Sequence, residues 1–183
     1  MTTNTNVDRA ALVRRAMVEL VAERGIHGTS MSQVAQRAGV ATGTAYVHYE
    51  SKDELLIAAF VEVKSRLGLV ATHDLDPSVQ AQGTFATLWR RIHDHVRSDL
   101  SLARFLSQID ESPLRRRAHE ALPEDDPLID LAVGMTHQLV DLPLEVIYEL
   151  GLAPAIRLAA SVTPLSPEQV ERVIAACWRS ISS

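Results

Sequence analysis

Residues 29–55 read TSMSQVAQRAGVATGTAYVHYESKDEL, and this segment indicates how the chain folds. Ser30, followed three residues later by Gln33, has the spacing of a capping box, in which each side chain satisfies an unpaired backbone amide at the start of a helix. Gly39 stands where that helix must end in a sharp turn, because glycine adopts a left-handed backbone conformation without steric cost. Ser51, again with a glutamate three residues later, marks the start of a further helix. The segment therefore predicts a short helix, a glycine turn, a second short helix and the start of a third.

Two short helices that meet at a glycine turn form either an ordinary pair of core helices or a helix-turn-helix. Ala35 is small enough to let two helices cross closely, while Val40 and Ala45 are expected to pack back into the same small core. Thr42 and Thr44 are then available to a partner, since their hydroxyl groups can bond base edges or phosphates and their methyl groups can meet a thymine methyl. These features favour a helix-turn-helix whose second helix enters the major groove of DNA.

The pattern A-x-x-A-G-V-x-x-G-T-x-Y-x-H-Y-x-S-K-x-E-L, which runs from Ala35 to Leu55, resembles the DNA-binding domain of the tetracycline-repressor (TetR) family. The helix expected over Val7–Arg24 and the turn Gly25–Thr29 also fit that family. Two residues depart from its pattern. Ala41 stands where a Ser or Thr usually caps the recognition helix, and Thr42 stands where Lys, Arg, Pro or Gln is common. The base preference of other members therefore does not carry over to this chain.

The resemblance implies which side chains contact a double-stranded DNA operator. Residues that match Tyr46, His48 and Lys52 touch the phosphate backbone or nearby bases in the family. The start of the preceding helix, at Ser30 and Ser32, clamps the same strand. Such contacts position the protein on the duplex, whereas contacts to base edges read the sequence.

The residues themselves add further contacts. Gly43 lets the backbone approach a sugar–phosphate strand closely, and we expect Thr42 and Thr44 to do most of the base reading. Arg9 touches a phosphate or the minor groove, or is simply solvated. Gln33 contacts DNA, or only caps its helix. The predicted DNA-binding set is Arg9, Ser30, Ser32, Gln33, Thr42, Gly43, Thr44, Tyr46, His48 and Lys52.

Composition and charge agree with a small DNA-binding head on a larger body. The 183 residues can hold a helix-turn-helix domain over 1–52 and an effector-binding and dimerisation domain over 53–183. An aromatic content of 4% with abundant Ala and Leu favours helices over sheets. The net charge of −5 divides into +2 for residues 1–52 and −7 for the remainder, so the head is mildly basic and the body acidic.

The remaining pattern predicts an all-α fold of about nine helices, with a three-helix head joined by a long fourth helix to a C-terminal bundle. That fourth helix is expected over about Lys52–Ala71. Pro154 lies inside a later helix and predicts a kink or break near Leu150. The other predicted helices cover about 78–97, 100–109, 128–140, 143–162 and 167–180, with a short helical piece after Pro113.

The last two predicted helices are more apolar than one buried face requires. They either cap the core or form a four-helix interface with a second copy, and the resemblance favours a homodimer. Two recognition helices that read two half-sites also need a two-fold axis. The predicted interface consists of Val146, Ile147, Leu158, Val170, Val173, Ile174, Cys177 and Trp178.

Members of the family usually enclose a small-molecule pocket among their helices 4 to 7. The resemblance therefore implies an effector, whose identity the sequence does not reveal. For each candidate contact, core packing or solvent exposure is the alternative. The candidates are Phe60, Trp89, His93, Phe105, Ile109, Met135 and His137.

These features together predict a ligand-responsive repressor that an effector releases from its operator. The alternative is a constitutive or activating regulator whose C-terminal domain binds a protein. An enzyme is disfavoured, because the chain has no nucleophile elbow, glycine-rich phosphate loop or metal-ligand cluster. We expect no metal, cofactor or membrane partner, and a bacterial cytoplasmic location, which suits the single cysteine, Cys177.

Overall fold

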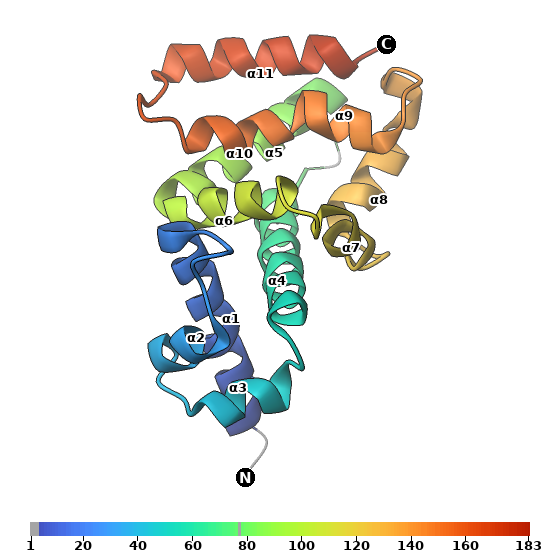
Figure 1. The fold of residues 1–183 in the computed structure, drawn as a ribbon. Helices are drawn as coiled ribbons and strands as arrows, with labels where there is room; N and C mark the ends of the chain where they lie inside the picture. Colours follow the sequence, from blue (N-terminus) through green and yellow to red (C-terminus); the bar gives the residue numbers. More distant parts are fainter. Residues whose placement is uncertain (1–3, 77) are drawn as a thin grey trace. The chain divides into compact units, whose positions relative to one another are not determined.

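The computed structural model describes residues 4–76 and 78–183, with side chains from residue 9 onward, and within these ranges the fold is all-α, as predicted (Figure 1). One isolated β-bridge joins Leu139 to Ser182. No helix in the described ranges is both long and apolar enough to cross a membrane. The elements are α1 (Asn4–Arg24), α2 (Met31–Arg37), α3 (Thr42–His48), α4 (Lys52–Thr72), α5 (Ala81–Ser98), α6 (Leu100–Asp110), α7 (Arg115–Glu120), α8 (Pro127–Gly134), the 3-10 helix η1 (Thr136–Gln138), α9 (Leu144–Gly151), α10 (Ala153–Ala159) and α11 (Pro167–Ile181).

The chain divides into two compact units. Unit 1 holds the described residues up to Lys64 together with Arg104–Leu122, and unit 2 holds Ser65–Ala103 and Pro123–Ser183. Unit 1 thus contains the three predicted head helices, the first half of α4, most of α6 and α7. The functional boundary after residue 52 stays a prediction.

In unit 1, α2 and α3 pack on each other and on α1 (Figure 1). The helices enclose a core of fully buried side chains, in which the sequence period of each helix brings one apolar face inward. The largest apolar stripe belongs to α1, which explains why a chain with so few aromatic residues still closes a small head. Members of this core are Val13, Met17, Val21, Val34, Ala35 and Ala45.

In unit 2, α5 packs against α10 and α11, and α9 contacts both α10 and α11. The Arg90 guanidinium on α5 forms two hydrogen bonds of 2.7 Å with the carboxylate of Glu171 on α11. The Phe85 and Trp178 rings, 5.4 Å apart, make an apolar contact between the same two helices. The C-terminal helix is therefore held to α5 by both an ion pair and ring packing.

Two helix boundaries of unit 2 lie at a proline and at a glycine. Pro154 lies in the first turn of α10, and the predicted break appears as the end of α9 at Gly151. The helix predicted over 128–140 is wrong in its second half: α8 ends at Gly134 and a 3-10 turn follows. Glycine destabilises a helix by about 1 kcal/mol relative to alanine, and Gly134 is the last residue of α8.

Candidate DNA-binding interface

Helix α2 is closed at both ends by its own residues. Ser30 Oγ accepts the backbone N–H of Gln33 at 3.3 Å, and Gln33 Oε1 accepts the Ser30 N–H at 2.9 Å. At the other end the Val40 N–H bonds the Ala35 carbonyl at 3.0 Å, and the Gly39 N–H bonds the carbonyl three residues before it at 3.2 Å. These two bonds form a Schellman motif, which Gly39 permits with its φ of +69°. The predicted capping box and glycine turn are confirmed.

Ion pairs fix α2 against α1. Arg37 Nη1 and Nη2 donate to the two carboxylate oxygens of Glu23 at 2.9 and 2.8 Å, and Nη1 also lies 3.4 Å from Glu19. The hydrogen bonds from Arg37 hold the pKa of Glu23 below its ordinary value of 4.5. Paired hydrogen bonds of this kind set orientation as well as proximity. Arg37 therefore acts within the head, and α2 is fixed before any partner arrives.

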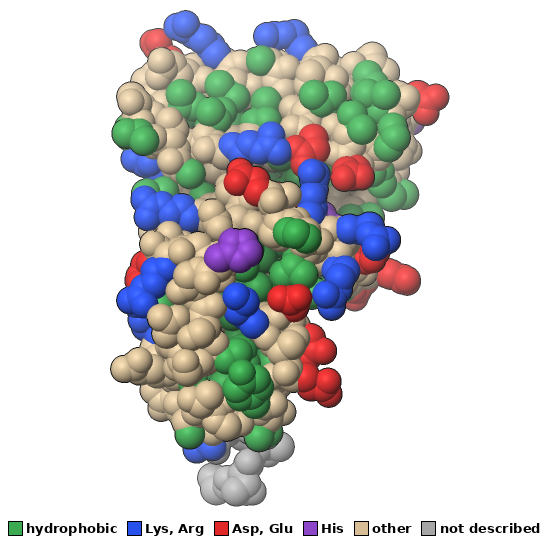
Figure 2. All heavy atoms as spheres, in the orientation of Figure 1, with side chains coloured by type: hydrophobic (Ala, Val, Ile, Leu, Met, Phe, Trp, Pro, Cys, Tyr) green, Lys and Arg blue, Asp and Glu red, His purple; other side chains and the backbone are tan. Residues whose placement is uncertain are grey.

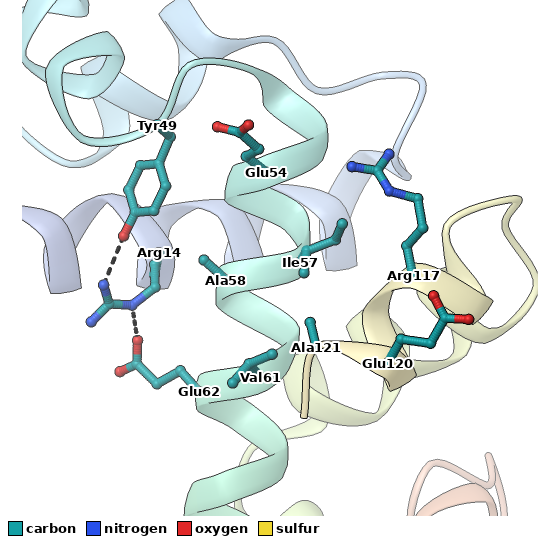
Figure 3. Close-up of a pocket in the computed structure, with 10 residues that line it drawn as sticks. All are labelled: Arg14, Tyr49, Glu54, Ile57, Ala58, Val61, Glu62, Arg117, Glu120 and Ala121. Carbon is teal, nitrogen blue, oxygen red and sulfur yellow. Dashed lines mark hydrogen bonds and ion pairs between the residues drawn. The ribbon is translucent and has the colours of Figure 1, made fainter. Parts of the chain in front are cut away.

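A second junction joins α1 to the end of α3 and to α4 (Figure 3). Arg14 Nη1 donates to the Tyr49 hydroxyl at 2.7 Å, and Arg14 Nε donates to the carboxylate of Glu62. Tyr49 is buried. Because Tyr49 follows α3 directly, this junction sets where the last turn of α3 lies in unit 1.

Helix α3 presents most of its surface to solvent. Thr42, Gly43, Tyr46 and Val47 are exposed, with 51% of Tyr46 and 80% of Val47 accessible, whereas Ala45 is fully buried. At about 100° per residue the four exposed positions fall within an arc of about 140°, on the side away from Ala45. No described residue hydrogen-bonds the side chain of Thr42 or Tyr46. This face is therefore open to a partner.

Val47 on this face is absent from the predicted set. The helical period counted from Gly43 identifies it, since residues four apart lie on one side of a helix. Thr44 is half-buried at the edge of the exposed arc, next to Val47. The exposed surface of α3 thus combines polar and apolar side chains.

The other predicted contacts also belong to unit 1. Ser30 and Ser32 are exposed, with their hydroxyl oxygens 3.1 Å apart, and Arg9 is exposed. Lys52 Nζ donates to two backbone carbonyls of the α1–α2 loop at 3.0 and 3.2 Å, so two of its three N–H groups are already used. His48 is half-buried at the end of α3. Contact of these residues with DNA stays a prediction.

An open pocket of about 750 Å³ also lies in unit 1 (Figure 3). One face of α4 forms its floor, and α7 stands at one side. Its charged groups have partners within the unit: besides the Arg14–Glu62 pair, Arg117 lies 3.9 Å from Asp53 and Glu120 lies 3.6 Å from Arg116. None of the seven predicted effector contacts lines this pocket. The lining residues are Arg14, Tyr49, Glu54, Ile57, Ala58, Val61, Glu62, Arg117, Glu120 and Ala121.

Five of the seven predicted effector contacts are buried. Met135 is half-buried and His137 is exposed, both in unit 2. Within that unit the Trp89 and His93 rings stack with centroids 5.3 Å apart. Contact with an effector stays a prediction for the whole set. The buried residues are Phe60, Phe105 and Ile109 in unit 1, and Trp89 and His93 in unit 2.

Trp89 carries the one orphaned polar atom of the described cores. Its indole N–H is buried with no hydrogen-bond partner of ordinary geometry among the described residues. The Cys177 thiol lies against it as a weak acceptor; burial raises the pKa of that thiol, and the hydrogen bond from Trp89 partly opposes the rise. A buried donor that bonds only to sulfur recovers little of the free energy lost on leaving water. Unit 2 thus contains a buried hydrogen-bond donor, the Trp89 indole N–H, to which its own residues offer no strong acceptor.

The predicted dimer surface divides into two sets. Ile147, Ile174 and Cys177 are buried within unit 2, and their contact with a second copy stays a prediction. Val146 is 38% accessible, and the unpredicted neighbour Leu150 is 42% accessible. Figure 2 shows hydrophobic side chains gathered in patches over the α9–α11 part of the chain. The half-buried members of the predicted set are Leu158, Val170, Val173 and Trp178.

Comparison with known proteins agrees with the geometry of the head. Residues 13–59 match the family model of bacterial regulatory proteins of the tetR family. The head of this chain is identified as the DNA-binding domain of a TetR-family regulator. This family consists of transcriptional regulators, not enzymes, and the match covers α1 from Val13, α2, α3 and the first turns of α4.

Similarity to TetR-family proteins extends over the whole chain. An HTH-type transcriptional regulator from Haemophilus influenzae is 26% identical over 95% of this chain and 96% of its own length. A crystal structure of a TetR-family regulator from the same species has a TM-score of 0.82 and 26% identity over 99% of this chain and all of that chain. The regulator FadR from Bacillus subtilis, solved in complex with stearoyl-CoA, has a TM-score of 0.68 and 18% identity, and covers 92% of this chain and 95% of its own. The last likeness is one of fold.

Proposed function

We propose that this TetR-family regulator is a dimeric, ligand-responsive repressor that binds a palindromic operator. The exposed face of α3 carries the proposal. Its Thr42 and Tyr46 side chains have no partner among the described residues, while caps and ion pairs close the rest of the head. A rigid head with one unsatisfied polar face is suited to a partner that supplies hydrogen-bond donors and acceptors, as the major groove does.

The apolar surface of unit 2 supports the dimer. Val146 and Leu150 are exposed on α9, next to half-buried apolar residues of α11. A second copy related by a two-fold axis would cover these side chains. It would also supply the second α3 helix that a palindromic operator needs, with half-sites about 34 Å apart along the duplex. The mildly basic head makes few phosphate contacts alone, so the second head also supplies affinity.

The orphaned indole N–H of Trp89 supports effector binding in unit 2. A ligand that carries a carbonyl oxygen among apolar groups would satisfy this donor, and the acyl thioester bound by the FadR neighbour has that chemistry. We therefore propose a fatty-acyl compound as the effector class. Release follows if the ligand binds the DNA-incompetent conformation more tightly than the DNA-bound one.

The experiment that tests the proposal is selection of bound sequences from a random DNA pool by the purified protein at moderate salt. Enrichment of an inverted repeat is the expected result, and the variant Thr42→Ala/Tyr46→Ala is the control that should enrich nothing. Absence of enrichment by a folded, dimeric wild-type protein would contradict the operator proposal.

The selected operator then tests the effector. Stearoyl-CoA is expected to weaken operator binding by the wild-type protein, and Trp89→Phe, which removes the N–H but keeps an aromatic ring, is expected to weaken that response. Operator binding that no acyl-CoA changes would contradict the effector class. It would favour the alternative, a constitutive or activating regulator whose C-terminal domain binds a protein.

A further inference from the structure

We propose that Val47 determines base specificity by contacting the C5-methyl group of a thymine in each half-site. The inference rests on the proposed operator binding and names one base-reading side chain of that interface. Its starting point is the exposure of Val47, which at 80% exceeds the 48% of Leu12 on α1 and the 51% of Tyr46 on α3. Exposed apolar side chains are common singly, so exposure alone decides nothing. The surroundings of Val47 supply the argument.

The first argument is space. Gly43 precedes Val47 by four residues, one turn of α3, and a Cβ built on Gly43 would meet nothing within 4 Å. Helical side chains lean toward the N-terminus, so the Val47 side chain lies over the turn that contains Gly43. The space over this turn is therefore open, and the two Val47 methyl groups are not covered by any neighbouring side chain of the turn. A base edge can therefore approach them without displacing any part of the protein.

The second argument is position. Val47 belongs to the exposed arc of α3 with Thr42 and Tyr46, two residues of the predicted DNA contact set. The fixed position of Tyr49, which accepts a hydrogen bond from Arg14, holds the last turn of α3 that carries Val47. A side chain that reads a base must be held in this way, because a contact that moves freely cannot discriminate between bases.

The third argument is chemistry. Valine offers no hydrogen-bond donor or acceptor, so it cannot read the polar pattern of a base pair. The thymine methyl is the one apolar group that a base pair of unmodified DNA presents in the major groove. Thr44 beside it can bond a base through its hydroxyl, whereas Val47 can contribute only apolar contact. The structure thus assigns hydrogen-bond reading to the threonines and methyl reading to Val47.

The test replaces the thymines of one selected half-site by deoxyuridine, one position at a time. Deoxyuridine pairs like thymidine but lacks the methyl group. At one position, the substitution should weaken wild-type binding about fourfold, the ratio that corresponds to burial of one methyl-sized group. For Val47→Ala the same substitution should change binding by less than about 1.5-fold. Contact between the Val47 methyl groups and the thymine methyl is then seen as non-additivity: the effects of Val47→Ala and of deoxyuridine on the binding free energy do not sum in the double change.

The control variant is Leu12→Ala, which shortens an apolar side chain of α1 that is 48% exposed. Leu12→Ala should retain the full wild-type sensitivity to deoxyuridine. The inference is overturned if no single deoxyuridine weakens wild-type binding, or if the sensitive position affects the wild type and Val47→Ala equally. Failure to select any operator would instead contradict the proposed function, so the two failures are distinguishable. A thermal melt of Val47→Ala that matches the wild type excludes misfolding as the cause.

Discussion

Helices α2 and α3 each have seven residues and pack on each other, yet their ends and faces are satisfied differently. Helix α2 buries Met31, Val34 and Ala35, begins with a capping box and ends in a Schellman motif. Helix α3 buries Ala45 alone, and its N-cap residue, Ala41, has no side chain that could accept a hydrogen bond. The ends and the apolar face of α2 are thus satisfied by other residues of this chain, whereas one face of α3 stays exposed and its N-terminus has no side-chain cap.

The difference indicates which helix is scaffold and which is interface. A helix that only supports the fold is expected to have capped ends and a buried apolar face. A helix that binds a partner is expected to depart from one or both of these rules. An uncapped, weakly buried helix of seven residues is unstable by itself. It persists here because α2, α1 and the Arg14–Tyr49 hydrogen bond hold it. The following changes test this division.

The largest expected effect on stability comes from the same substitution made on each helix. Val34→Ala should lower the free energy of unfolding by about 2 kcal/mol, because it removes two methyl groups from a fully buried site and leaves a cavity. Val47→Ala should change it by less than about 0.5 kcal/mol, since that side chain is solvated. Urea denaturation at one fixed protein concentration measures both values. Equal losses would show that α3 contributes to the core as α2 does.

The next effect concerns DNA affinity. Tyr46→Ala should weaken binding to every sequence by about tenfold, because a side chain that contacts the backbone positions the head without reading bases. Thr44→Val, which keeps the shape and removes the hydroxyl, should instead change the preference among sequences. Binding across a randomised operator library measures both. Uniform losses from both variants would contradict this division of roles.

Local chemistry explains which parts of the fold could be predicted. The capping box at Ser30, the left-handed Gly39 and the break before Pro154 each depend on residues within four positions of one another, so the sequence alone contains the cause. The two junctions of the head are different. Arg14 and Glu62 are 48 residues apart. The chain has 17 other Arg or Lys side chains with which Glu62 could pair, so the sequence offers no local signal for this choice.

The candidate site shows the same limit. The threonines and Tyr46 of α3 were predicted from a motif, and the helical period gives the side of α3 on which Val47 lies. How far Val47 is exposed depends on how α3 docks, which the sequence does not show. The predicted dimer set also mixed buried Ile174 with exposed Val146, because both lie on apolar helices. Periodicity identifies an apolar stripe and cannot say whether the chain or a second copy covers it.

A smaller effect on stability is expected from removing the N-cap side chain of α2 and from adding one to α3. Ser30→Ala should lower the free energy of unfolding by about 1 kcal/mol, because the backbone N–H of Gln33 loses its acceptor, the Ser30 hydroxyl oxygen. Ala41→Ser should raise it by roughly 0.5 kcal/mol, since Ala41 already has the extended backbone of an N-cap, with φ −67° and ψ 147°. Thermal unfolding of both variants measures the change. No gain from Ala41→Ser would show that α3 is limited by docking and not by its missing cap.

The smallest expected effect is a pH dependence that belongs to α2 and is absent from α3. Arg37 lowers the pKa of Glu23 in the folded state, so the pair contributes stability above 4.5, the ordinary value, and this contribution is lost as the pH falls through the lower folded-state pKa. The stability difference between the wild type and Arg37→Ala should therefore shrink on acidification. Because both side chains are exposed, added salt should reduce the difference as well.

Glu23→Gln is the matched variant. It should remove the same pH dependence of stability, and the double variant with Arg37→Ala should lose no more of that pH dependence than either single variant. A difference that stays constant from neutral pH to below 4.5 would mean that Arg37 holds α2 through its packing, and that the ion pair seen between α1 and α2 adds nothing to the scaffold on which α3 depends.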